Sequence, residues 1–165
     1  MRGRRLHPDE YEEAIAALSC CYNLMVVDTG TGLSHAALTG VLAGVDGAVI
    51  VAEPTADAAS RASMTLDWLT QIGLGSLAAE AVVVMSHDRG SREIDERAVR
   101  DYFAGRCSAV VEVPADPHLA AGGRIDRERC RPTTRAAFEQ LAAVVADGFA
   151  TPRHRSGQRA VPGGF

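Results

Sequence analysis

The sequence contains no lysine, and all 17 of its basic residues are arginine. Aromatic residues make up only 5% of the chain, so its core must be built mostly from alanine, valine and leucine. No apolar run approaches the roughly 20 residues that a membrane-spanning helix needs, so no membrane span is predicted. The net charge is −4, with both signs interspersed, whereas a dedicated nucleic-acid-binding protein usually carries a concentrated basic face. The sequence therefore predicts no nucleic-acid partner.

Two further absences concern secretion and metal binding. The basic N-terminus is followed at 8–14 by Pro-Asp-Glu-Tyr-Glu-Glu-Ala rather than by the apolar segment of a signal peptide. No Cys-x-x-Cys pair exists, and no histidine stands at metal-ligand spacing from a cysteine. We therefore expect a cytoplasmic protein with buried or half-buried free thiols. The four cysteines are Cys20, Cys21, Cys107 and Cys130.

The order of apolar segments predicts an α/β fold. Uninterrupted hydrophobicity is typical of strands buried on both faces of a parallel sheet that helices cover. We expect one domain at 1–150 with a mostly parallel sheet flanked by helices, and a flexible tail at 151–165 whose composition buries little apolar surface. Strands are predicted at 22–28, 48–53, 81–85 and 108–113. Helices are predicted at 8–18, 55–73, 93–103 and 133–149, with a helix-like segment at 36–42.

The most informative loop is Asp28-Thr29-Gly30-Thr31-Gly32, directly after the first predicted strand. In open parallel sheets the loops after strands share one edge, and ligands bind there. An aspartate at the end of a buried strand is costly unless its charge is used, and Mg²⁺ with its water shell is one such user. The glycines allow backbone N–H groups to approach an anion. The alternative is an aspartate that caps a tight turn before a helix.

Two other loops fall on the same predicted edge. The proline-bounded segment 113–119 is either a loop that holds a flat base through backbone groups or a plain surface loop. The segment Ser86-His87-Asp88-Arg89-Gly90 contains a Ser, a His and an Asp. Consecutive residues cannot adopt the geometry of a catalytic triad, and the GxSxG elbow is absent, so a hydrolase of that type is not predicted.

The segment from Tyr22 to Leu33 resembles the acidic strand and switch turn of MinD/ParA-type ATPases, including the spacing Asp-x-x-x-Gly. Segments 49–54, 82–84 and 113–119 are similar to later family segments and occur in the same order. The resemblance covers about residues 9–150. The sequence is most similar to actinobacterial MinD-like ATPases, some of which accompany type VII secretion loci. It implies a Rossmann-like P-loop NTPase fold, incomplete at its N-terminus.

The resemblance also implies ATP and Mg²⁺ as cofactors. Asp28 would organise the water shell of the Mg²⁺ ion, and Gly32 would sense the terminal phosphate. Hydrolysis of ATP would drive a switch in dimerisation or in binding of a protein partner. The other residues that the resemblance places beside the nucleotide are Thr29, Gly30, Ser86, Pro114, Ala115 and Asp116.

Two departures from the family limit what the resemblance implies. Only 21 residues precede Tyr22, and they contain no lysine-bearing phosphate loop of the GKT or GKS type. The asparagine that the family usually has after its third strand is replaced here by Ser86, His87 and Asp88. The chain is therefore either the C-terminal portion of an ATPase or a truncated, degenerate interaction module. Standing alone, it is expected to be inactive and to self-associate through a sheet that lacks a neighbouring strand.

Overall fold

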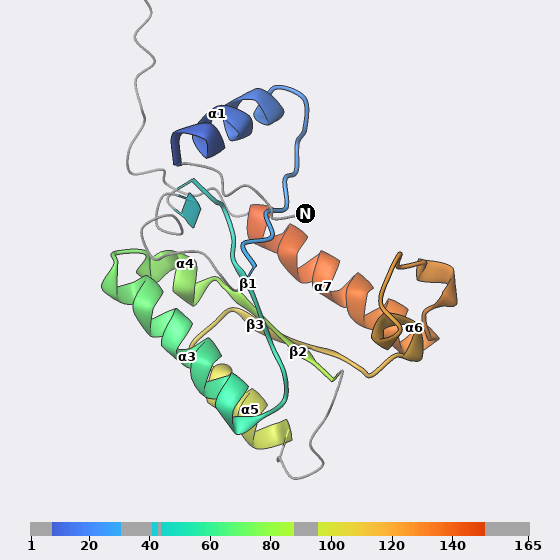
Figure 1. The fold of residues 1–165 in the computed structure, drawn as a ribbon. Coiled ribbons are helices and arrows are strands. Elements are labelled where there is room, and N and C mark those ends of the chain that lie inside the picture. Colours follow the sequence, from blue (N-terminus) through green and yellow to red (C-terminus); the bar gives the residue numbers. More distant parts are fainter. Residues whose placement is uncertain (1–7, 31–40, 43, 88–95, 151–165) are drawn as a thin grey trace, which may run out of the picture.

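In a computed structural model, the described part of the chain comprises residues 8–30, 41–42, 44–87 and 96–150. Within it, three parallel strands form one sheet in the order β1-β2-β3, and helices lie on both faces of the sheet (Figure 1). The strands are Val49–Ala52 (β1), Val82–Ser86 (β2) and Ala109–Val113 (β3). The predicted α/β fold with a mostly parallel sheet flanked by helices is thus confirmed.

The helices form one layer on each face of the sheet. On one face lie α3 (Ala56–Gln71), α4 (Gly75–Ala79) and α5 (Glu96–Phe103), and on the other lies α7 (Pro132–Ala150) (Figure 1). The remaining helices are α1 (Pro8–Ser19), α6 (Pro117–Ala120) and the 3₁₀ turn η1 (Arg127–Arg129). The four long helices were predicted, whereas α4, α6 and η1 are too short to show a helical period. No described helix is long and apolar enough to cross a membrane.

Strand β2 explains why the predicted strands are apolar throughout. Its residues alternate between the two faces: Val83 and Met85 pack in the layer of α3, α4 and α5, while Val82 and Val84 pack in the layer of α7. A strand buried on both sides has no polar positions, which is the pattern seen in the sequence. On the helices, the buried partners include Ala62, Leu66, Leu69, Phe103 and Ala137.

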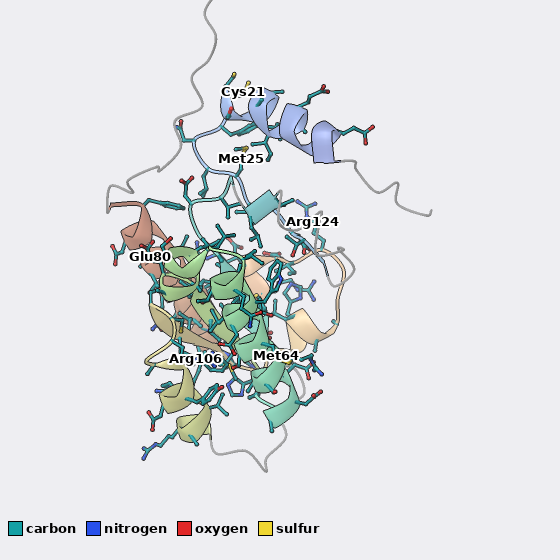
Figure 2. The ribbon with its side chains drawn as sticks, turned by 90° about the vertical axis from the view of Figure 1, so that its left-hand side faces the viewer. Cys21, Met25, Met64, Glu80, Arg106 and Arg124 are labelled. Carbon is teal, nitrogen blue, oxygen red and sulfur yellow. The ribbon has the colours of Figure 1, made fainter. Side chains whose placement is uncertain are left out.

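Helix α3 begins and packs as its sequence predicts. The hydroxyl of Thr55 accepts a hydrogen bond from the backbone N–H of Ala58 at 3.1 Å and so caps the first turn. On the exposed side of the same layer, Arg106 joins α3 to α5 (Figure 2). Its guanidinium donates to the hydroxyls of Ser63 and Tyr102 and forms an ion pair with Asp67.

The strand predicted at 22–28 is wrong. This segment is irregular, and Val26 is 89% exposed. In both views, α1 stands away from the sheet (Figures 1 and 2). A strand needs a hydrogen-bonding neighbour as well as strand-forming residues, and no described strand pairs with this segment. The predicted helix-like residues 36–40 and the predicted tail at 151–165 lie outside the described residues.

Strand β1 forms an open edge of the described sheet. Its register with β2 puts Val49 and Val51 on the α7 face, yet these side chains are 47% and 68% exposed. β1 carries no charged residue, whereas the opposite edge strand, β3, carries Glu112 in an ion pair with Arg100. Charged residues on edge strands oppose unwanted pairing, so β1 is the less protected edge.

Candidate functional site

The loops after β2 and β3 meet at the carboxyl edge of the sheet. There a small cavity of about 140 Å³ is lined by Ser86, Pro114, Ala115, Asp116 and Leu119. The structure therefore brings together four of the residues that the family resemblance places beside the nucleotide. Their neighbourhood follows from parallel pairing, because Ser86 is in register with Val113. Their role in binding a nucleotide stays a prediction.

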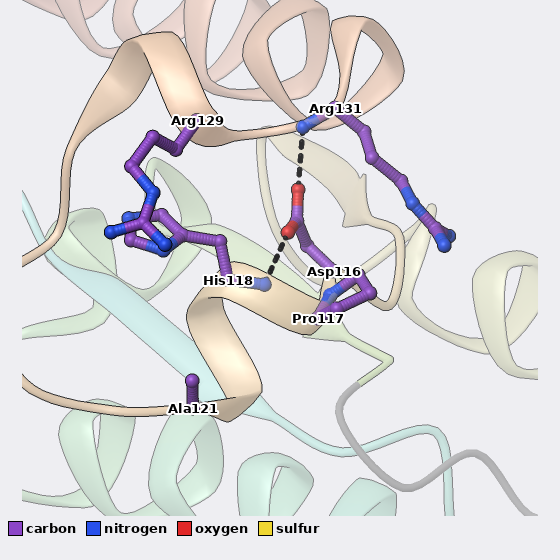
Figure 3. A pocket seen from close by; sticks show the side chains of 6 residues that line it. All are labelled: Asp116, Pro117, His118, Ala121, Arg129 and Arg131. Carbon is purple, nitrogen blue, oxygen red and sulfur yellow. Dashed lines mark hydrogen bonds between the residues drawn. The ribbon is translucent and has the colours of Figure 1, made fainter.

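Asp116 is buried and holds two helices together. One carboxylate oxygen accepts the backbone N–H of His118 at 2.8 Å and so caps α6, in which Pro117 is the first residue. The other accepts the backbone N–H of Arg131 at 2.7 Å, just before α7 (Figure 3). The Arg131 N–H bond is the main reason why the pKa of Asp116 lies below its ordinary value. This carboxylate is thus committed to the fold, which leaves backbone groups as the contacts available to a base.

The lowered pKa of Asp116 predicts how the free energy of unfolding depends on pH. Because the folded protein favours the charged form of Asp116, this group stabilises the fold fully above the ordinary aspartate pKa of about 4. The stabilisation is lost as the pH falls through the lowered pKa of the folded state. Urea unfolding from pH 6 to pH 2 is expected to show a smaller acid-dependent loss for Asp116→Asn than for the parent chain. Asp57→Asn, a change at an exposed position on α3, should behave as the parent. Parallel curves for parent and Asp116→Asn would contradict the assignment.

A larger cavity, of about 330 Å³, lies on the other side of Asp116 between α6 and η1. The imidazole of His118 is held there, since its Nε2 accepts the backbone N–H of Asp126 at 2.9 Å. Figure 3 shows Arg129 beside His118, while Arg131 extends to the opposite side. Sequence reasoning missed this site, although the arginine-rich stretch 124–135 was a visible signal. The cavity is lined by Asp116, Pro117, His118, Ala121, Arg129 and Arg131.

Asp28 closes a tight turn, which is the predicted alternative to a metal site. Its Oδ1 accepts the backbone N–H of Gly30 at 2.9 Å, and Gly30 has the positive φ of +58° that glycine readily adopts. Asp28, Thr29 and Gly30 line neither cavity. Gly32 lies outside the described residues.

Side chains that could bind a metal ion are dispersed in the described part of the chain. It contains no group of three or more histidine, cysteine, aspartate or glutamate residues close enough to hold a metal ion. One oxygen of Asp28 already closes its own turn, and both oxygens of Asp116 accept backbone N–H groups.

The cysteines only partly match the prediction. All four are free thiols, as expected. Cys130 is buried and Cys107 half-buried, and burial raises the pKa of the Cys107 thiol. Cys20 and Cys21 are exposed, so the expectation of burial was wrong for them. The reason is that they follow α1, which stands away from the sheet, as the position of Cys21 in Figure 2 shows.

The chain is similar to the ESX-1 secretion-associated protein EspI of Mycobacterium tuberculosis. It is 35% identical over 141 residues to the proteins of strains CDC 1551 / Oshkosh and ATCC 25618 / H37Rv. The match covers 84% of this chain and 21% of each relative, so the chain spans about a fifth of the length of these relatives. No family model matches the chain, and no solved structure matches it.

Proposed function

We propose that this chain is a secretion-associated domain of MinD/ParA-like ATPase type that supplies the base side of a Mg-ATP site. The similarity to an ESX-1 secretion-associated protein supports the secretion role. The observation that carries the nucleotide role is the 140 Å³ cavity, which gathers Ser86, Pro114, Ala115 and Asp116 at the carboxyl edge of a parallel sheet. A further segment or another chain would supply the phosphate loop.

In the complete site, water would attack the γ-phosphate of ATP, and the cycle would switch dimerisation or binding of a protein partner. The size of the cavity limits how much of the nucleotide this chain could bind, because small-molecule sites usually measure about 300–1,000 Å³. A cavity of 140 Å³ accommodates only part of a nucleotide. Backbone groups of Pro114 and Ala115 are suited to the flat edge of a base, since the Asp116 carboxylate is already engaged. The proposed role of Asp28 is to orient the water shell of Mg²⁺ with its second carboxylate oxygen.

The proposal predicts no ATP hydrolysis by the chain alone. The chain has no lysine to hold the β- and γ-phosphates, and losing such charge-assisted contacts costs on the order of several kcal/mol of binding. Phosphate release from Mg-ATP should therefore equal the background of buffer and of Asp28→Asn. Turnover in the purified chain that disappears with Asp28→Asn would overturn this prediction.

The alternative function is a non-catalytic interaction module that has lost nucleotide binding. The engagement of Asp28 in its own turn favours it. Calorimetric titration with Mg-ATP decides between the two. Micromolar affinity that vanishes with Asp28→Ala, but persists with Asp57→Ala on α3, would exclude the alternative. Heat of binding that is absent from parent and variants alike would favour it. In either case we propose that the open edge of β1 mediates self-association or accepts a strand from a further segment.

A further inference from the structure

The connection from α6 to α7 concentrates positive charge in an otherwise acidic protein. Five of the 17 arginines fall within residues 124–135, against two acidic residues, while the whole chain has a net charge of −4. All five belong to described residues, and four of them are exposed. They are Arg124, Arg127, Arg129, Arg131 and Arg135.

Internal pairing neutralises only some of these arginines. Arg127 forms an ion pair with Glu139, and Arg135 donates to the carbonyl of Glu128 at 3.3 Å. The backbone N–H of Arg129 donates to the carbonyl of Asp126 at 3.1 Å, but its guanidinium has no hydrogen bond or ion pair with any described residue. The guanidinium of Arg131 makes one long contact, 3.5 Å to the carbonyl of Ala115. Arg129 and Arg131 both line the 330 Å³ cavity, and most N–H donors of their guanidinium groups have no acceptor among the described residues.

The remaining walls of the cavity suit a carboxylate on a short aliphatic stem. Pro117 and Ala121 present apolar surface, and both carboxylate oxygens of Asp116 already accept backbone N–H groups. The Nε2 atom of His118 already accepts the backbone N–H of Asp126, which fixes the imidazole ring beside the cavity. In the connection between α6 and η1, Ile125 is 63% exposed and offers an apolar contact.

The directions of the two guanidinium groups indicate the size of the occupant. Arg129 and Arg131 extend to opposite sides of Asp116 rather than toward one point (Figure 3). A single small anion would contact only one of them. An extended chain with several carboxylates can contact both, and guanidinium groups pair with carboxylates in a bidentate manner.

We propose that the cavity between α6 and η1 docks an acidic peptide segment of a partner protein. One Asp or Glu side chain of that segment enters the cavity beside Arg129. A second carboxylate pairs with Arg131, and an apolar side chain packs on Ile125. Charge complementarity selects this occupant, because the stretch 124–135 carries five arginines against two acidic residues. This proposal does not depend on nucleotide binding.

The test is fluorescence anisotropy of the full chain with a fluorescein-labelled, glutamate-rich peptide that carries one central leucine. The matched probe has glutamine in place of every glutamate. Only the glutamate peptide should bind, and its affinity should fall as salt shortens the Debye length from roughly 30 Å at 0.01 M to roughly 8 Å at 0.15 M. Equal binding of the two peptides would overturn the proposal.

Substitutions separate docking in the cavity from general attraction. Arg129→Gln and Arg131→Gln should each weaken binding about two- to fivefold, the range expected for exposed ion pairs. Ala121→Leu fills the cavity without changing charge and should weaken binding to a similar extent. Arg61→Gln removes an exposed arginine on α3 and should leave binding unchanged.

Three results would contradict the proposal. Ala121→Leu without effect, or Arg61→Gln as damaging as Arg129→Gln, would show attraction without use of the cavity. Displacement of the peptide by an equal concentration of inorganic phosphate would show a small-anion site instead. If the Arg131 variant fails to fold, Arg129→Gln is sufficient for the test. The Arg129 side chain has no partner among the described residues, so its replacement removes no bond from the fold. A positive result together with a failed Mg-ATP titration would leave this proposal standing and remove the nucleotide role.

Discussion

Replacing Phe103 with alanine is expected to lower the free energy of unfolding by about 3–5 kcal/mol. Phe103 is fully buried, at 0% exposure, at the end of α5 in the layer that contains Leu69 and Val83. Its ring also meets the ring of Tyr102 edge to face at 5.2 Å. The loss combines the transfer free energy of the aromatic ring with the cost of the cavity that remains. Urea unfolding followed by circular dichroism measures it.

Phe149→Ala is the matched control, because Phe149 lies on α7 and is 50% exposed. Its truncation should cost less than about 1 kcal/mol, as is usual for partly exposed positions without a network. Similar losses for the two variants would show that α5 does not close the core as the structure has it. A changed urea m-value in Phe103→Ala would mean that the mutation altered the compactness of the native or denatured state, or that the variant no longer unfolds in two states.

Replacing Val51 with lysine is expected to abolish self-association of the chain. Val51 is 68% exposed on the open edge of β1, and a lysine there opposes strand pairing. The parent should form dimers or larger species as its concentration rises, while Val51→Lys should stay monomeric. Because the side chain is already exposed, the stability cost should stay within about 0.5 kcal/mol. Light scattering over a concentration series measures the difference.

Val26→Lys is the control for this prediction. Val26 is even more exposed but lies in the irregular segment 22–28, outside the described sheet. If Val26→Lys were monomeric while Val51→Lys still self-associated, the contact between chains would belong to the segment 22–28. A parent chain that stays monomeric at high concentration would rule out the edge as a site of self-association.

Much of the sheet and its helices was predictable, since the signals are local. The uninterrupted apolar run of β2 identifies a strand covered on both faces, and the structure buries it between two helix layers. Thr55 after Pro54 marks the start of α3, and the stripe that includes Leu66 and Leu69 is its buried face. Parallel pairing then brings Ser86 and the 114–116 loop together without further information.

The segment 22–28 and Asp116 show where local signals end. Leu24 to Val27 has the composition of a buried strand, but burial depends on a neighbouring strand that no described residue provides. Asp116 was predicted beside a base because of its loop. Its second carboxylate oxygen instead accepts the N–H of Arg131, a residue 15 positions further along the chain. No pattern within a loop reveals such a contact.

The sequence by itself determined the α/β class, the strands β1 to β3 and the long helices, because hydrophobic periodicity and capping act within a few residues. It also determined that the chain has no lysine for a phosphate loop. The tertiary structure alone decided that β1 is an open edge, that Asp28 closes its own turn, and that Arg129 and Arg131 flank one cavity. These features depend on contacts between segments that are far apart in the chain. Such contacts determine which groups are buried and which hydrogen-bond partners they find.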